Sequence, residues 1–431
     1  MSRCTTNKEA WQLLFDKYNI LEEINQNGYF KITAKQINEY REARLMTKFD
    51  NSANLPELFK DNNLAILPIT SNSYMIARFQ TYKKFEEIED EEIIKISFPE
   101  YIQSLDYNNI TSEAIAINCA YITQILENFL DEEDLVPTIS GKMGSGNFEF
   151  KISKNENEAE YINVSVQNSR IEIDGGFEGI NSLALVEAKN VISDDFMVRQ
   201  LYYPYRLWKS KINKPVRPVY MVYSNGIFNV YEYKFENDED YSSIKFVKSK
   251  KYSIEDTEID IQDIQEIFNN INEFVEEPEI AFPQADSFDR VINLCELLLD
   301  EPKTKNDITE NYAFDERQTN YYTDAARYLG LVNKNRNDGN IVFELTELGR
   351  RILNLRYKQR QLEFVKLILK HRAFYDYLRL YFGNSEKPTT LDTIEIMKYC
   401  DLYKIESEST YKRRASTIRG WVEWILDLTR I

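Results

Sequence analysis

Histidine and cysteine are scarce in this sequence, which has one histidine and four cysteines among 431 residues. Cys4, Cys119, Cys295 and Cys400 lie far apart and form no Cys-x-x-Cys pair, so a zinc-binding motif is not expected. With His371 as the single histidine, hydrolases and nucleases that depend on a histidine base are also disfavoured. His371 lies beside two basic residues, and we expect it on the surface or at a helix end. Catalysis should therefore rely on carboxylates and lysines.

Long hydrophobic runs are absent as well. No stretch approaches the about 18 consecutive apolar residues that span a bilayer. The segment Met1–Leu14 has neither a basic region that leads into an apolar stretch nor a small-residue cleavage site. We therefore expect a cytoplasmic protein with no membrane segment. A hydrophobic content of 43% can supply real cores, and the length favours two to four domains.

Positive charge is in deficit, because 53 Lys and Arg residues face 71 Asp and Glu residues, a net charge of −18. This balance disfavours a protein that coats nucleic acid without preference, since phosphate contacts need clustered cations. Residues 341–431 nevertheless hold 17 Lys and Arg against 12 Asp and Glu. A local basic surface for specific DNA binding is therefore compatible with the sequence.

Three regions follow one another along the chain. Residues 1–95 have the pattern of a small α/β unit, an N-terminal accessory or DNA-recognition domain without visible chemistry. Residues 96–280 form a second α/β unit. After the acidic, proline-containing linker Glu276–Pro283, residues 285–431 are predominantly helical.

The central region alternates helices and strands. A helix is predicted around Ser112–Phe129, and the glycine-rich stretch Thr138–Ser145 is predicted to be a loop. A second helix should span Asp194–Lys209 after the N-cap Ser193, and Asn225-Gly226 indicates a hairpin turn. Extended segments are predicted at Phe148–Ile152, Tyr161–Gln167, Arg170–Phe177, Leu183–Ala188, Val216–Tyr223 and Ile227–Tyr233.

The C-terminal region begins with three helical patterns, Phe288–Leu299, Lys305–Thr309 and Thr319–Leu329. Two extended segments follow on either side of an Asp338-Gly339 turn. Helices followed by a two-stranded wing are typical of a winged helix-turn-helix. The C-terminal region is therefore predicted to be a mainly helical, winged-helix DNA-binding region.

The chemistry is concentrated in "RIEIDGGFEGINSLALVEAKN", residues 170–190. Alternate side chains of a strand share a face, so Glu187 and Lys189 should point the same way, as should Glu172 and Asp174. The other face of the second strand would carry Ala184, Val186 and Ala188, which suits burial against a helix. Ionisable residues among such neighbours are costly to desolvate, and this cost is usually tolerated only for function.

These residue types suit metal-assisted phosphodiester hydrolysis. The carboxylates of Asp174 and Glu187 and the backbone carbonyl of Ala188 are the hard oxygen ligands that Mg²⁺ prefers. Lys189 would orient the attacking water and stabilise developing charge. The structural alternative for Asp174, Glu187 and Lys189 is an ion-paired sheet edge.

Asp174, a glycine-rich turn and then Glu187-Ala188-Lys189 resemble the signature of the PD-(D/E)xK nuclease superfamily. The pattern alone occurs often by chance, but here it lies on two consecutive predicted strands that a helix and further strands follow. Residues 40 to about 240 also resemble type II restriction endonucleases, for example in "FPEYIQSLDYNNITSEAIAINCAYITQILENFL" and "RQLYYPYRLW". The resemblance implies an α/β (α+β) PD-(D/E)xK nuclease core, Mg²⁺ as cofactor, site-specific cleavage of double-stranded DNA and a companion DNA methyltransferase.

The resemblance also suggests accessory residues. Some members of the superfamily carry a glutamine and a tyrosine on the helix after the motif, where this chain has Gln200 and Tyr205, although the spacing departs from that pattern. Glu178 could join the metal site or be a solvated turn residue. Glu127 resembles the extra acid that some relatives supply from a preceding helix, with an ordinary surface carboxylate as the alternative.

A basic cluster near the C-terminus is the candidate DNA contact. It consists of Lys412, Arg413, Arg414 and Arg419 at helical spacing, with Tyr411 and Trp421 interleaved. A solvated helix face is the alternative interpretation. A palindromic DNA site would favour a two-fold homodimer, with one active site for each strand.

The sequence thus predicts a type II restriction endonuclease. Two alternatives stay open. The first is a repair or defence nuclease of the same fold that acts on structured or modified DNA. The second is a non-catalytic winged-helix regulator in which the central acids are structural.

Overall fold

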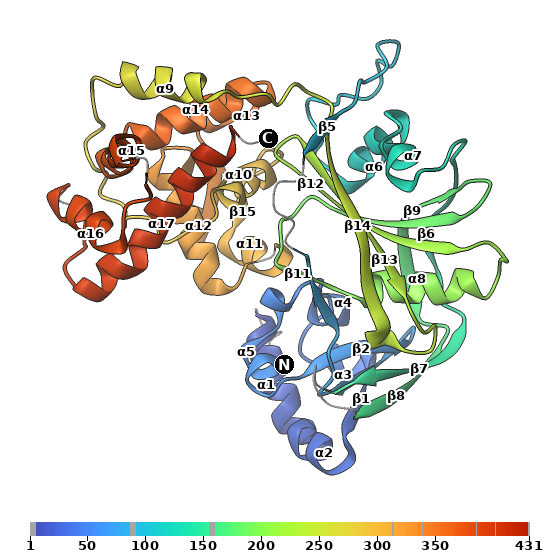
Figure 1. The fold of residues 1–431 in the computed structure, drawn as a ribbon. Helices are drawn as coiled ribbons and strands as arrows, with labels where there is room; N and C mark the ends of the chain where they lie inside the picture. Colours follow the sequence, from blue (N-terminus) through green and yellow to red (C-terminus); the bar gives the residue numbers. More distant parts are fainter. Residues whose placement is uncertain are drawn as a thin grey trace.

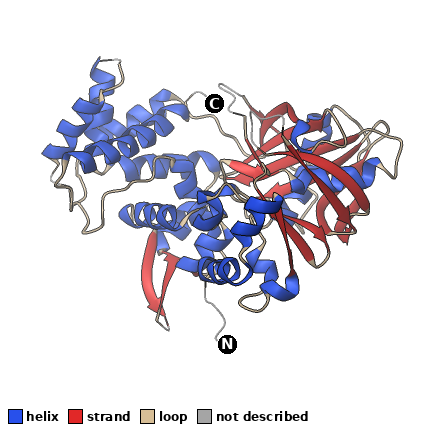
Figure 2. Cartoon of the chain, turned by 90° about the horizontal axis from the view of Figure 1, so that it is seen from below, coloured by secondary structure: helices blue, strands red, loops and turns tan. Residues whose placement is uncertain are grey.

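The computed structural model describes residues 6–86, 92–154, 160–312, 314–337, 339–384, 386–400 and 402–429. Figure 1 shows a half of mixed α/β structure, built from the N-terminal and central regions, beside a helical C-terminal half. Figure 2 shows the same division, with most strands gathered on one side and a separate small sheet among the helices. The mixed α/β class is confirmed. Asp338 of the expected turn lies outside the described residues.

The N-terminal segment packs short helices around three antiparallel strands. Asn19, with a φ of 48°, separates the first two helices, and Trp11, Leu14 and Phe59 are fully buried between the elements. The elements are α1 (Asn7–Tyr18), α2 (Ile20–Asn27), β1 (Tyr29–Thr33), α3 (Ala34–Ile37), α4 (Ala43–Met46), the 3₁₀ turn Ser52–Asn54, α5 (Glu57–Asp61), β2 (Ala65–Thr70) and β3 (Ser73–Ala77).

A five-stranded sheet joins the three N-terminal strands to the central region. Its strand order is β1-β3-β2-β8-β7, in which β7 (Asn147–Ser153) and β8 (Tyr161–Gln167) form an antiparallel hairpin. The parallel bridge between β2 and β8 pairs Thr70 with Gln167. This one sheet therefore contains strands from both the predicted N-terminal region, residues 1–95, and the predicted central region.

A mixed seven-stranded sheet forms the centre of the α/β half, in the order β5-β14-β13-β12-β10-β9-β6. The pairs β10–β12 and β14–β5 are parallel, and the others are antiparallel. The strands are β5 (Ile93–Lys95), β6 (Val136–Gly144), β9 (Arg170–Glu178), β10 (Leu183–Lys189), β12 (Val216–Ser224), β13 (Ile227–Phe235) and β14 (Ile244–Ser253), and a separate pair joins β4 (Tyr82–Lys84) to β11 (Asp195–Met197).

Helices cover both faces of this sheet. Ala184, Val186 and Ala188 of β10 pack on the side of α6 (Glu113–Ile122) and α7 (Ile125–Leu130), as the alternation of the sequence predicts. Leu183 and Leu185 face the opposite core, which contains α8 (Arg199–Lys209). The predicted helix Ser112–Phe129 is interrupted at Gln124, whose φ is 60°. The result is a helix–sheet–helix sandwich with β10 at its centre.

Two local predictions for the central region are wrong. Thr138–Ser145 is not a loop but lies largely in β6, where Gly141 adopts a φ of 90° that other residues rarely reach. The helix predicted to start after Ser193 begins only at Arg199. The preceding segment forms β11 instead, because Asp195 is buried and accepts hydrogen bonds from the backbone and hydroxyl groups of Ser52.

The helical half begins with a strand-and-helix unit and continues as a bundle. The small sheet has the order β15-β17-β16 and packs with α10 to α12. The elements are α9 (Ile261–Asn270), α10 (Phe288–Leu297), β15 (Lys303–Thr304), α11 (Lys305–Asn311), α12 (Glu316–Tyr328), β16 (Val332–Asn337), β17 (Asn340–Leu345), α13 (Glu347–Leu353), α14 (Tyr357–Leu369), α15 (Arg372–Asn384), α16 (Thr390–Tyr399) and α17 (Glu408–Asp427).

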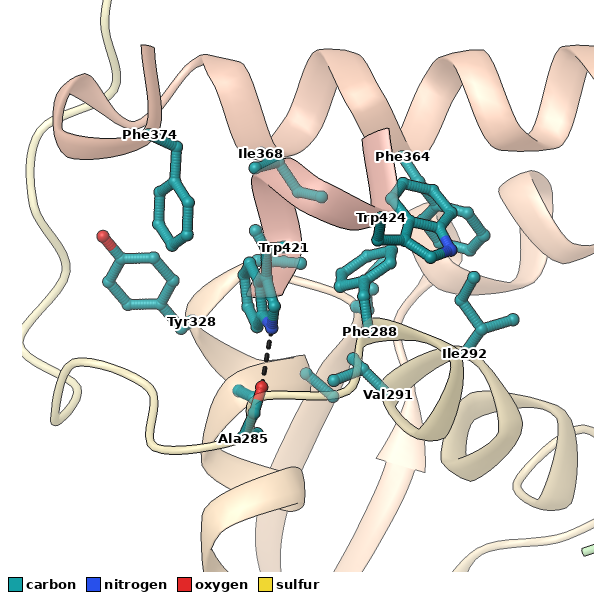
Figure 3. Close-up of a cluster of buried hydrophobic side chains, with 14 of the residues drawn as sticks. Ala285, Phe288, Val291, Ile292, Tyr328, Phe364, Ile368, Phe374, Trp421 and Trp424 are labelled. Carbon is teal, nitrogen blue, oxygen red and sulfur yellow. Dashed lines mark hydrogen bonds between the residues drawn. The ribbon is translucent and has the colours of Figure 1, made fainter. Parts of the chain in front are cut away.

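Aromatic side chains form the core of the helical half (Figure 3). Trp421 is fully buried against Phe288 and donates a hydrogen bond of 2.7 Å from Nε1 to the carbonyl of Ala285. The prediction that Trp421 lies on the surface beside the basic cluster is therefore wrong. His371 is also buried, stacked on Tyr328 at 4.2 Å, so it does not lie on the surface. It does lie at a helix end, directly before α15, as the other alternative predicted. Within the described ranges, no helix has both the length and the apolarity to cross a membrane.

Candidate active site

The hairpin of β9 and β10 brings Asp174 next to Glu187. The register pairs Gly175 with Val186, so the next residues, Asp174 and Glu187, stand opposite each other. Asp174 accepts a hydrogen bond of 3.0 Å at Oδ2 from the backbone N–H of Ala188. The two carboxylates predicted to hold a metal thus lie on neighbouring strands at the same end of the hairpin.

Lys189 completes this cluster. Its Nζ lies 2.6 Å from Oε1 of Glu187 and donates a 3.0 Å hydrogen bond to the carbonyl of Ala188. Only 15% of the Lys189 side chain and 10% of the Glu187 side chain are exposed, so the ion pair is largely removed from water. The ammonium group therefore bonds two of the oxygens that are candidate ligands for a cation.

Gln200 also belongs to the cluster. It lies in the first turn of α8 and donates a 2.5 Å hydrogen bond from Nε2 to Oε1 of Glu187. The amide oxygen of Gln200 is buried without a hydrogen-bond partner among the described residues. Tyr205 of the same helix lies elsewhere, where its hydroxyl bonds the Asp238 carboxylate. The structure therefore brings Gln200, but not Tyr205, to the motif.

Glu113 is a member of the cluster that the sequence reasoning missed. It occupies the first turn of α6, and its Oε1 lies 3.4 Å from Nζ of Lys189. Burial and the neighbouring Asp174 raise its pKa, which Lys189 partly offsets. One feature of the sequence could have identified Glu113, namely its position directly after the N-cap Ser112. In a helix–sheet–helix sandwich, the start of a helix can face the carboxyl end of a strand.

Glu127 and Glu178, the other candidate accessory acids, lie elsewhere. Glu127 accepts a 3.2 Å hydrogen bond from the backbone N–H of Leu135, close to its own helix. Glu178 forms an ion pair of 2.7 Å with Lys214 at the opposite end of the hairpin. Each side chain therefore has a local structural partner.

The N-terminal segment contributes charges to the same place. Lys48 and Asp50 line a cavity of about 70 Å³ together with Glu113, Lys189 and Glu310. The backbone carbonyl of Asp50 accepts a 2.8 Å hydrogen bond from Met197 of β11, which fixes this segment to the central region. A region without visible chemistry in the sequence thus forms one wall of the candidate site.

The electrostatics of the cluster are dominated by acids. Burial, opposed by Lys189 and reinforced by the charge of Asp174, raises the pKa of Glu187 to about 8. Although burial disfavours its charge, the carboxylates of Glu187 and Glu113 hold the pKa of Lys189 well above its ordinary value. Several carboxylates thus share one buried ammonium group, and an added cation would relieve their mutual repulsion.

The ligand atoms that the cluster offers are oxygens, which Mg²⁺ prefers. Asp174, Glu187 and the carbonyl of Ala188 would supply three oxygens, and Mg²⁺ usually keeps several waters in addition. Among the residues that the structure describes, no three His, Cys, Asp or Glu side chains form a cluster that could hold a metal. The candidate set therefore depends on two carboxylates and one backbone carbonyl.

The basic cluster lies along the N-terminal part of α17. Lys412, Arg413 and Arg419 are exposed, whereas Arg414 is half-buried with an Nε that lacks a hydrogen-bond partner among the described residues. Burial and the charge of Arg413 lower the pKa of Arg414. Because α12 contributes nearby charges, from Tyr321 and Asp324, to the surroundings of Arg414, the cluster borders α12.

Three families, each described as a domain of unknown function, match successive parts of the chain. The matches cover residues 8–76 (DUF6996), 77–253 (DUF6997) and 290–430 (DUF7226). The cluster around Lys189 falls in the second match, and the basic cluster falls in the third. No curated protein and no solved structure matches the chain.

Proposed function

We propose that the protein is a magnesium-dependent endonuclease that cleaves a specific double-stranded DNA sequence, as a type II restriction endonuclease does. The observation that carries this proposal is the convergence of Asp174, Glu187, Lys189 and the carbonyl of Ala188 at one end of a hairpin. Charged groups so largely removed from water are costly unless they serve a purpose, and phosphodiester hydrolysis uses this combination of groups.

Each residue has a role in the proposed reaction. Asp174, Glu187 and the Ala188 carbonyl would hold Mg²⁺, which supplies charge stabilisation and an acidified water when bound. Lys189, already 2.6 Å from the Glu187 carboxylate, would orient the attacking water and offset negative charge on the phosphate. Gln200 holds Glu187 in position through its hydrogen bond.

The fold around the cluster supports a PD-(D/E)xK core. The strands β6, β9 and β10 are neighbours, α8 follows them, and β12 then pairs with β10 in parallel. This order, with α6 and α8 on opposite faces, is the one that the resemblance to that superfamily implies. The motif lies on β9 and β10, as it does in the expected core.

The helical half supports DNA binding by a winged helix-turn-helix. Its order of elements is α10, β15, α11, α12 and the β16–β17 hairpin, as in that motif. The exposed residues of β16 include Lys334 and Arg336 within a run of asparagines. Together with Lys412 and Arg413, these cations would contact phosphates on either side of α12.

The decisive experiment is incubation of purified protein with phage DNA, in Mg²⁺ and in EDTA, beside four variants. Glu187→Gln and Lys189→Ala should reduce cleavage about 10²–10⁴-fold. Glu178→Gln and Lys214→Ala, which alter an ion pair of the same hairpin away from the cluster, should cut as the parent does. DNA binding in EDTA, measured by gel shift, should be unchanged in all four.

The outcomes also separate the alternatives. Discrete fragments from unmodified DNA support the restriction endonuclease, and their ends give the sequence that a companion methyltransferase would protect. Cleavage confined to modified or structured DNA would indicate a repair or defence nuclease. Magnesium-independent binding without any cleavage would indicate a winged-helix regulator and refute the nuclease. Sedimentation of the DNA complex would test the expected homodimer.

A further inference from the structure

The candidate catalytic cavity is narrow in this structure. Its volume is about 70 Å³. Binding pockets for small molecules usually have about 300–1,000 Å³. A phosphodiester with its flanking nucleotides does not fit into a space of this size, so a wall would have to move for DNA to enter it.

The wall that can move belongs to the helical half. One side of the cavity is the segment Lys48–Asn54, which hydrogen bonds from Met197 and to Asp195 fix to β11. The opposite side includes Glu310 of α11. Figure 1 shows α11 above the N-terminal helices, at the border between the two halves.

Two sets of contacts connect α11 to the N-terminal segment across this border. Arg41 forms an ion pair of 2.7 Å with Glu310, and the two side chains are only 13% and 20% exposed. Asn54 donates hydrogen bonds from Nδ2 to the carbonyls of Thr309 at 3.0 Å and Tyr312 at 2.5 Å. We call these contacts the latch. Because the ion pair is largely shielded from water, it should stabilise the contact between α11 and the N-terminal segment more than an exposed pair would.

A further set of contacts between the halves lies at the turn between β12 and β13. The turn between β12 and β13 is anchored in the helical half, where the backbone N–H of Asn225 donates to Glu296 at 2.8 Å and its side chain pairs with Gln361. This buried turn, near the chain crossing into the helical half, can serve as a pivot. The latch is then the part that must separate.

The helical half is also connected to the catalytic strand. Asn293 of α10 donates a 2.8 Å hydrogen bond to the carbonyl of Asn190, directly after Lys189, and accepts one of 3.0 Å from Ile192. A movement of α10 and α11 relative to the sheet would therefore act on the end of β10. Access to the cavity and the position of Lys189 should change together.

We propose that the latch formed by Arg41, Glu310 and Asn54 keeps the candidate catalytic cavity narrow, and that duplex DNA bound by the helical half releases it. The inference rests on the proposed function. Because α11 and α12 form the helix pair that would engage DNA, the same rigid unit carries both the DNA contact and Glu310. Cleavage is thereby restricted to DNA that the helical half has bound.

The test uses charge reversal in the full-length protein and a readout that does not require cleavage. Hydrogen–deuterium exchange is measured for residues 48–54 and 189–193 in Arg41→Glu, in Glu310→Arg and in the double variant, all in EDTA. Each single reversal should raise the exchange rates about tenfold, and the double variant should restore them to within about threefold. Sheared phage DNA should raise the same rates in the parent protein. Lys17→Glu, which breaks the 2.6 Å pair with Glu39 and leaves the three latch residues unchanged, is the matched control and should change nothing at these segments.

Cleavage assays of the same proteins distinguish the two proposals. If the single reversals increase exchange and the double variant reverses this, the latch is supported even if no protein cuts DNA, in which case the nuclease proposal fails alone. If the parent protein cuts DNA but the single reversals exchange as the parent does, the latch is overturned and the nuclease stands. A double variant that exchanges as fast as the single ones also overturns the latch, because the restored ion pair should close it.

Discussion

Replacing Glu132 by glutamine should destabilise the hairpin that carries the candidate active site. Glu132 is 7% exposed and accepts hydrogen bonds at Oε1 from the backbone N–H groups of Asn181, at 2.5 Å, and Ser182, at 3.1 Å. Its second oxygen accepts from the hydroxyl of Ser182. These bonds hold the turn between β9 and β10.

The expected loss follows from the difference between charged and neutral acceptors. A hydrogen bond to a charged group contributes about 1.5–3 kcal/mol, against about 0.5–1.5 kcal/mol for a neutral one. Glutamine keeps one acceptor oxygen and places an amide N–H₂ where Ser182 Oγ now donates. Since the three bonds share one carboxylate and are not additive, we expect a loss of about 2–3 kcal/mol in the free energy of unfolding.

Calorimetric unfolding at pH 7 is the assay. A loss of this size should lower the Tm of the α/β half by about 4–12 °C. The neighbouring Glu133 is exposed, and Glu133→Gln is therefore the matched control, with an expected Tm close to that of the parent. Equal Tm values for the two variants would refute the anchoring role of Glu132.

The pH dependence gives a second check on Glu132. Although burial opposes its charge, the hydrogen bonds from Ser182 and Asn181 hold the pKa of Glu132 below its ordinary value. A carboxyl with a lowered pKa stabilises the fold above its unfolded pKa of about 4.3, and this contribution is lost as the pH falls through the folded pKa. The difference between parent and Glu132→Gln should therefore be largest near neutral pH and shrink below about pH 4.

Three further outcomes are expected. Gln200→Ala should lower the cleavage rate about 10–100-fold and weaken magnesium binding, measured by titration, because Glu187 loses its positioning partner; unchanged values would mean that the hydrogen bond is incidental. Glu127→Ala should leave cleavage intact and cost about 1 kcal/mol in urea unfolding, since it removes one hydrogen bond to the backbone. Lys412→Ala combined with Arg413→Ala should weaken DNA binding on all sequences alike and reduce the slope of log affinity against log salt by about 2; an unaltered slope would exclude these side chains from the DNA interface.

The sequence predicted best the strands whose side chains alternate between buried and exposed positions. Tyr161–Gln167 is a strand with the predicted bounds and buries every second residue. Asn225-Gly226 forms the expected hairpin turn, with positive φ at both residues. The grouping of Asp174, Glu187 and Lys189 also followed from alternation, since one hairpin brings all three together.

The parts that were missed depend on distant partners. Asp195 does not start a helix because Ser52, more than a hundred residues earlier, binds its carboxylate. Glycines in Thr138–Ser145 indicated a loop, but pairing with β9 makes the segment a strand. Glu113 and Asp50 reach the candidate site only through the packing of α6 and the N-terminal segment. Local patterns contain no information about such long-range contacts.

During synthesis on the ribosome, the sheet that the three N-terminal strands begin is completed only later. Thr70 of β2 emerges 97 residues before its partner Gln167 of β8. At about 5–20 residues per second, the edge of β2 stays open for about 5–20 s. An unpaired edge is a template for pairing with other chains, so truncated products that end before residue 147 should aggregate or exchange strands, and chaperone binding is most valuable in this interval.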